Sequence, residues 1–186
     1  MDKQYQEFYD KGHADEFNAA GLINEVIGGF ARPAPTELDK KYHTDILWES
    51  PKGFLCSIDK KMQKRKKRGD ANYDPYATWI ELRDNFGRKG WAYCQAPKLR
   101  EIGYNISDSH DYVMIESPNS YLFIQRNKLL PFTINLIKGK ELVLKNPRQI
   151  NIPYRREDSD HKDVVVSVLF KDLESITQFK INKPCR

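Results

Sequence analysis

The spacing of apolar side chains near the start of the chain predicts a helix over residues 14–27. Four apolar residues recur there at steps of three or four positions, the repeat of one helical face, and two glycines follow as a stop signal. They are Phe17, Ala20, Ile23 and Ile27, followed by Gly28 and Gly29. We therefore expect a helix that packs this apolar face against the rest of the protein.

Runs rich in β-branched and aromatic residues predict strands along the rest of the chain. Residues 44–48 and 54–59 form two such runs, and the short loop between them contains a proline and a glycine, which is typical of a hairpin. Further strands are predicted at residues 78–83, 91–94, 111–116, 121–126 and 164–170, and short helices at residues 97–102 and from Lys128 onward with Asn127 as cap. Helices and strands mixed in this way indicate an α/β fold.

Charged side chains interrupt the predicted hairpin. Asp45 lies in its first strand, and Asp59 lies in the second with Lys61 two positions beyond it. Because side chains i and i+2 of a strand point to the same face, Asp59 and Lys61 are expected side by side. Two carboxylates supply oxygen ligands for magnesium, and a nearby ammonium stabilises charge on a phosphate. The pattern favours phosphodiester hydrolysis; the structural alternative is that Asp45 caps a turn and Asp59 pairs with Lys61 at the surface.

The order Asp, hairpin, Asp-x-Lys resembles the PD-(D/E)XK nuclease superfamily, although Thr44 stands where many members have proline. This resemblance implies a restriction-endonuclease-like fold, a mixed β-sheet core flanked by helices, here with additional C-terminal strands. The segment from Lys11 to Glu16 is similar to the start of archaeal Holliday-junction resolvases, which points to Glu16 as the helix glutamate of the site; Glu7 and Glu25 are alternatives. The motifs W-I-E-L at 79–82 and G-x-x-G-W-x-Y at 87–93, followed by an apolar strand that ends in Glu116, resemble uncharacterised phage nuclease-like proteins.

The resemblance implies a magnesium-dependent DNA endonuclease, possibly encoded by a phage. Glu16, Asp45 and Asp59 would bind Mg²⁺, for which Mn²⁺ can substitute, and Lys61 would complete the catalytic set. The partner is expected to be DNA, and symmetric cleavage of a junction would require a homodimer. No nucleotide cofactor is expected, because the chain has neither a phosphate-cradling glycine-rich loop nor a dinucleotide fingerprint.

Basic side chains are concentrated directly after the predicted catalytic strand. The chain has 31 lysine and arginine residues against 26 acidic ones, and residues 60–68 hold seven of the 31 and none of the 26. We expect six of the seven to contact DNA phosphates. They are Lys60, Lys64, Arg65, Lys66, Lys67 and Arg68. The alternatives are a solvated loop or a nuclear-import signal.

Length and composition predict one nuclease-like domain over residues 1–186, with a core at about 11–137 and an extension at about 138–186. The start of the chain has no signal-peptide pattern and no stretch is apolar enough for a membrane, so we expect a cytoplasmic protein, in the host cytoplasm if it is viral. Three scattered cysteines, Cys56, Cys94 and Cys185, suit free thiols better than a zinc site. Two further readings stay open: a non-catalytic nucleic-acid-binding protein on a nuclease-like fold, and a structural or host-interaction protein.

Overall fold

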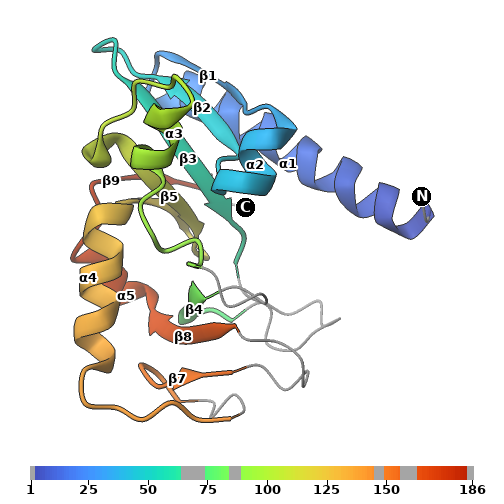
Figure 1. The fold of residues 1–186 in the computed structure, drawn as a ribbon. Coiled ribbons are helices and arrows are strands. Elements are labelled where there is room, and N and C mark those ends of the chain that lie inside the picture. The colour runs from blue at the N-terminus through green and yellow to red at the C-terminus, as the bar shows by residue number, and fades with distance from the viewer. Residues whose placement is uncertain (1–2, 64–73, 84–88, 145–148, 156–162, 184–186) are drawn as a thin grey trace. The chain divides into compact units, whose positions relative to one another are not determined.

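The structure is a computed structural model that describes residues 3–63, 74–83, 89–144, 149–155 and 163–183, with the side chains of the first helix described from residue 14 onward. The chain is a mixed α/β protein whose sheets are flanked by helices, as the sequence predicts (Figure 1). It divides into two compact units. Unit 1 comprises Met1–Lys60 and Gln95–Tyr112, and unit 2 comprises Lys61–Cys94 and Val113–Arg186. The prediction of a single domain is not tested by this division.

Unit 1 is built on an antiparallel meander of three strands, β1 (Phe30–Pro33), β2 (Ile46–Glu49) and β3 (Leu55–Lys61). β5 (Asp111–Glu116) begins in this unit and follows β3 in the strand order. The β2–β3 hairpin is confirmed, with Ile46 opposite Ile58. Its loop closes tightly because Gly53, at φ +78°, donates its N–H to the carbonyl of Ser50.

Helix α1 (Lys3–Val26) packs on β1 and β2 and extends further toward the N-terminus than the prediction. Ala20 and Ile23 are buried as expected, but Phe17 is 65% exposed. The apolar stripe is narrow, and Phe17 lies six positions before Ile23, about 120° away around the helix. The prediction that Phe17 belongs to the buried face is therefore wrong.

Two glycines after α1 bring the helix close to the sheet. Gly28 and Gly29 both have φ of +86°, which favours glycine. A Cβ atom on Gly29 would lie 2.2 Å from the carbonyl oxygen of Glu49, so no larger residue fits there. The indole of Trp48 donates to the Gly28 carbonyl at 2.9 Å. These contacts fix where α1 meets the meander and so where its acidic residues lie.

The sequence predictions missed β1 and the short helix α2 (Thr36–Tyr42). Prolines at positions 33 and 35 give this stretch the composition of a loop. Pro33 is tolerated because β1 is the first strand of its sheet and can leave an N–H position empty. α2 ends at His43, whose left-handed backbone (φ 48°) directs its N–H to the carbonyl of Asp39.

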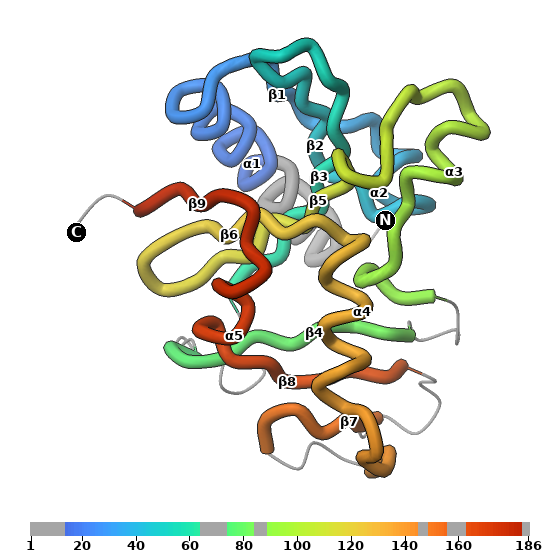
Figure 2. Tube along the Cα trace, turned by 90° about the vertical axis from the view of Figure 1, so that its left-hand side faces the viewer, coloured from blue at the N-terminus to red at the C-terminus, as the bar shows by residue number. Residues whose placement is uncertain are grey.

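The described part of unit 2 contains five further strands and two helices. In one sheet β4 (Ala77–Arg83), β8 (Val164–Leu169) and β7 (Pro153–Tyr154) pair antiparallel in that order, as Figure 2 shows. The other strands of the unit follow the order β5, β6 (Ser120–Gln125) and β9 (Phe179–Asn182). Helix α4 (Arg126–Ile137) contacts β6, and α5 (Phe170–Glu174) contacts β6 and β8. An apolar core that includes Ile80, Trp91, Val113, Leu122 and Val166 fills the space between these elements.

Most predicted elements after the hairpin are confirmed, including β4, β5, β6, β8 and the short helix α3 (Ala96–Glu101). The predicted strand at residues 91–94 is wrong, because this segment forms a turn after Gly90. The predicted cap at Asn127 is also wrong, since α4 begins at Arg126 with Gln125 as its cap. Among the described residues, none of the helices has the length and apolar composition that a membrane span requires.

Candidate functional site

Asp45 lies where the three-stranded meander of unit 1 ends, and its main chain bonds to β3 and to the residue that follows β1. Its N–H donates to the carbonyl of Ile58 at 2.9 Å, and its carbonyl accepts from the N–H of Ala34 at 2.8 Å. Its carboxylate is buried, and Oδ2 accepts the N–H of Lys60 at 2.6 Å. The carboxylate thus takes the part that a main-chain carbonyl plays within a sheet. Because backbone and side chain are both held, the carboxylate has a fixed position.

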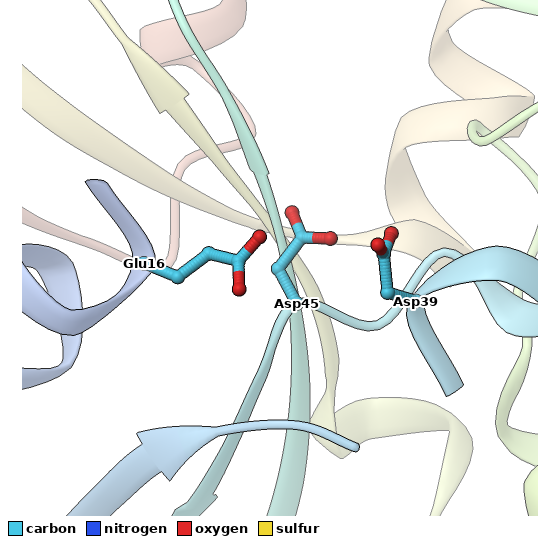
Figure 3. Close-up of side chains that lie close together, drawn as sticks. All are labelled: Glu16, Asp39 and Asp45. Carbon is cyan, nitrogen blue, oxygen red and sulfur yellow. The ribbon is translucent and has the colours of Figure 1, made fainter. Parts of the chain in front are cut away.

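Two further carboxylates meet Asp45. Figure 3 shows Glu16 from α1 and Asp39 from α2 on either side of it. One carboxylate oxygen from each of the three lies within 4.8 Å of the others. Asp45 is buried and the other two are half-buried. Such a set offers the hard oxygen ligands that magnesium and manganese prefer.

The structure therefore brings together two of the four residues that the sequence assigns to catalysis, Glu16 and Asp45. Asp59, the third of the four, lies on β3 and is fully buried. Asp45 comes directly before Ile46 and Asp59 directly after Ile58, the pair that ends the β2–β3 ladder. Asp59 is nevertheless not a member of the group of three. Its predicted role as a metal ligand stays a prediction.

The two lysines that end β3 point in different directions, as expected for neighbours on a strand. Nζ of Lys60 donates to the main-chain carbonyl of Asp15 in α1 at 3.1 Å. The ammonium of Lys60 thus lies beside the helix residue that precedes Glu16, and its predicted contact with DNA stays a prediction. Nζ of Lys61 lies over the ring of Trp91 in unit 2, 5.4 Å from its centroid.

The remainder of the predicted DNA-contact segment, Lys64 to Arg68, lies outside the described residues. The residues on either side are held within unit 2. Gln63 donates its side-chain amide to the carbonyl of Asp74 at 2.8 Å, and its N–H to the carboxylate of Glu116 at 3.3 Å. Gln63 and Asp74, the described residues on either side of this segment, are thus bonded to one another.

Asp39 is the member of the acidic group that the sequence predictions missed. A signal for it exists: Thr36, Glu37 and Asp39 follow a proline, an arrangement typical of the first turn of a helix. α2 ends at Tyr42, three residues before the buried Asp45, so a helix recognised there would have made Asp39, six residues before Asp45, a candidate. The two prolines in front concealed the helix.

Other buried polar groups in unit 1 have structural roles. The carboxylate of Asp111 accepts from the Ser57 hydroxyl at 2.8 Å and from the N–H groups of Gln95 and Ala96 at the start of α3. It therefore ties α3 to β3. Burial raises the pKa of the Cys56 thiol from 9.0 to about 12, so this cysteine is no nucleophile at neutral pH.

Glu81 is an acidic residue on β4 in unit 2. Its side chain is buried, and its carbonyl accepts the N–H of Ala92 at 3.3 Å. Among the described residues it belongs to no acidic group that could hold a metal.

Comparisons with protein-family models, with curated proteins and with solved structures find no match for this chain. What the protein does is therefore inferred from its residues and their geometry. The acidic group of Glu16, Asp39 and Asp45, together with the Asp59-x-Lys61 strand beside it, is the feature of the molecule on which that inference rests.

Proposed function

We propose that this protein is a magnesium-dependent endonuclease that hydrolyses phosphodiester bonds in DNA, on a restriction-endonuclease-like core formed by α1 and the β1–β2–β3 meander with β5. The observation that carries the proposal is the meeting of Glu16 and Asp45. The two residues are 29 positions apart in the sequence and come from a helix and a strand end, yet their carboxylate oxygens lie within 4.8 Å. The PD-(D/E)XK pattern leads one to expect this meeting.

The chemistry of the three carboxylates fits a divalent cation. All three donors are oxygens, which suits Mg²⁺, and two are partly open to solvent, which suits an ion that keeps some of its water. Three like charges this close repel one another, and a cation relieves that repulsion. Glu16, Asp39 and Asp45 would hold the ion, which polarises a phosphate and lowers the pKa of a bound water.

The chain's own residues supply position and charge. The N–H of Lys60 fixes one oxygen of the Asp45 carboxylate in place. Strand alternation gives Asp59 and Lys61 the same side of β3, so the end of this strand supplies a carboxylate and an ammonium. In the proposed reaction Asp59 orients the attacking water or joins the metal ligands, and Lys61 stabilises the negative charge that develops on the phosphate.

DNA binding is assigned to the basic segment that follows β3. Residues 64–68 are five consecutive basic residues, and they offer a salt-sensitive attraction to phosphates. Gln63, which precedes this segment, donates its side-chain amide to the carbonyl of Asp74, the first described residue after it. We propose that it holds the DNA strand while hydrolysis proceeds.

A second candidate is a nucleic-acid-binding protein that has lost catalysis. The observation in its favour is that Asp59 does not belong to the acidic group, although the superfamily pattern gives it a metal-binding role. Such a protein would bind DNA equally well with and without magnesium. A junction-specific nuclease is a variant of the first proposal and differs only in its substrate.

The test is cleavage of supercoiled plasmid, linear duplex and a four-way junction in Mg²⁺ or Mn²⁺, with EDTA as control. We expect cutting that needs the metal and is lost in Asp59→Ala, while a gel-shift assay shows that this variant still binds DNA. Magnesium-dependent turnover that survives in Asp59→Ala would remove Asp59 from the site. A plasmid that is shifted but never cut by the wild type would favour the binding protein.

A further inference from the structure

Trp91 is a buried aromatic residue whose ring meets a lysine of the proposed site. It lies in the core of unit 2, and Nζ of Lys61 is 5.4 Å from the centroid of its ring. An ammonium within about 6 Å of an aromatic face is attracted by the ring's quadrupole, most strongly by that of tryptophan. The ammonium of Lys61 therefore has a defined place beside the indole.

The indole nitrogen indicates that Trp91 is more than a packing residue. A buried tryptophan usually donates its N–H to a partner, because an unsatisfied donor costs free energy. Among the described residues, Nε1 of Trp91 has no hydrogen-bond partner. A phenylalanine or leucine would contribute to the core without this cost, so packing alone does not explain a tryptophan. The contact with Lys61 does, since indole offers the best face to a cation.

The main chain on both sides of Trp91 is anchored to β4. Gly90 donates its N–H to Leu82 at 3.1 Å, and Ala92 donates to Glu81 at 3.3 Å. A Cβ atom on Gly90 would lie 2.4 Å from the carbonyl oxygen of Glu81, so the close approach requires glycine. The Gly-Trp pair thus sets the position of the ring relative to β4.

A second tryptophan fixes the plane of the ring. Trp79 of β4 meets Trp91 edge-to-face, with centroids 6.1 Å apart and an angle of 69° between the planes. This is a favourable arrangement for two aromatic rings. Two main-chain hydrogen bonds and one ring contact therefore hold Trp91 in a single orientation. A residue can position a flexible lysine only if it is itself held in this way.

We propose that Trp91 is a positioning residue for Lys61 and holds its ammonium where it acts on the phosphate, an inference that rests on the proposed nuclease function. Lys61 has a flexible four-carbon side chain, which loses conformational freedom when its end is held. Without the indole the ammonium is in its working position for less of the time. The rate of the chemical step falls, while DNA affinity, which depends on other contacts, stays.

The experiment compares Trp91→Leu with the conservative variant Trp91→Phe in plasmid cleavage. We expect Trp91→Leu to lower kcat about 3- to 30-fold with KM unchanged, and Trp91→Phe to retain most of the rate because it keeps a π face. In the double variant Trp91→Leu/Lys61→Ala the loss should equal that of Lys61→Ala alone. Equal losses in the Leu and Phe variants, a change in KM alone, or additive losses in the double variant would each overturn the proposal.

A core variant that does not touch Lys61 separates positioning from stability. Phe170, in the same core, serves as this control: Phe170→Leu should lower the melting temperature and leave kcat of the folded protein unchanged. A fall in kcat that matches that of Trp91→Leu would show that loosening the core is sufficient, and would refute a specific role for the indole.

A chemical measurement that does not depend on cleavage keeps the contact testable if the proposed function fails. Lysines are labelled with an amine-reactive reagent, and the modified peptides are quantified by mass spectrometry. We expect Lys61 to react at least about twofold faster in Trp91→Leu than in the wild type. Lys60, held at Asp15, should react at the same rate in both. If Lys61 reacts equally in both proteins, the ring does not hold the ammonium, whatever the protein's activity.

Discussion

Removing the Asp39 carboxylate tests the acidic group through stability as well as through activity. The oxygens of Glu16, Asp39 and Asp45 lie within 4.8 Å of one another. Two unit charges at that separation repel by about 1 kcal/mol in water and about 3 kcal/mol at an effective dielectric constant of 20. Since two of the three are half-buried, we expect Asp39→Asn to raise metal-free stability by about 1 to 3 kcal/mol, or about 2 to 10 °C in melting temperature.

The same substitution should remove the response to magnesium. A ligand at one hundred times its Kd stabilises the folded state by about 2.7 kcal/mol, which corresponds to about 5 to 10 °C for a chain of this length. Wild type should show such a rise between EDTA and saturating Mg²⁺, whereas Asp39→Asn should show little. Thermal denaturation followed by circular dichroism measures both quantities.

Glu37→Gln is the matched control, because Glu37 lies in the same first turn of α2 but is exposed and outside the group. Both substitutions remove one favourable interaction with the helix dipole, so the difference between them reports on the acidic group alone. The reasoning is refuted if Asp39→Asn and wild type gain equally from magnesium, or if Glu37→Gln loses the gain.

Three further predictions concern other parts of the molecule. Gly90→Ala should lower the free energy of unfolding, measured in urea, by about 1 to 3 kcal/mol, because its Cβ meets the Glu81 carbonyl. Gly21→Ala, in a helix with open space around it, should instead raise the free energy of unfolding by up to about 1 kcal/mol. Burial raises the pKa of the Cys56 thiol to about 12, so the folded state keeps a proton there that the unfolded state loses from pH 9.0 upward. The contribution of this thiol to stability is therefore complete below pH 9.0 and is lost as the pH rises towards 12. A thiol reagent at pH 8 should modify Cys56 only after the protein unfolds. Replacing Lys64 to Arg68 by serine should weaken DNA binding and flatten its dependence on salt in a fluorescence titration, and an unchanged slope would take the segment out of the interface.

The sequence predicted the β2–β3 hairpin and the strands β4, β5, β6 and β8 because each is a short apolar run bounded by turn residues. It misplaced residues 91–94, where an aromatic-rich run forms a turn. The reason is Gly90, whose close approach to Glu81 redirects the chain, and a composition-based rule does not contain that contact. It also missed α2, because prolines on either side of Ala34 conceal the start of the helix.

The residues of the candidate site that lie close together in the sequence were predictable from their spacing. The residue that reaches the site through a contact between separate elements was not. Asp45, Asp59 and Lys61 are identified by spacing along one hairpin, and Glu16 by its place in the preceding helix. Asp39 joins Asp45 only because α2 ends in a left-handed residue, His43, that turns the chain back. The different surroundings of Lys60 and Lys61 follow from strand alternation, but which side faces α1 is decided by tertiary packing.

Asp45 tests the central claim most directly, because it belongs both to the acidic group and to the predicted catalytic hairpin. The measurement is the rate of supercoiled-plasmid cleavage in saturating Mg²⁺ by wild type and by Asp45→Asn, whose amide oxygen can still accept the N–H of Lys60. The account predicts metal-dependent cutting by wild type and a loss of at least about a hundredfold in the variant, with its fold and DNA binding retained. Cutting at the wild-type rate by Asp45→Asn, or no cutting by either protein, would contradict it.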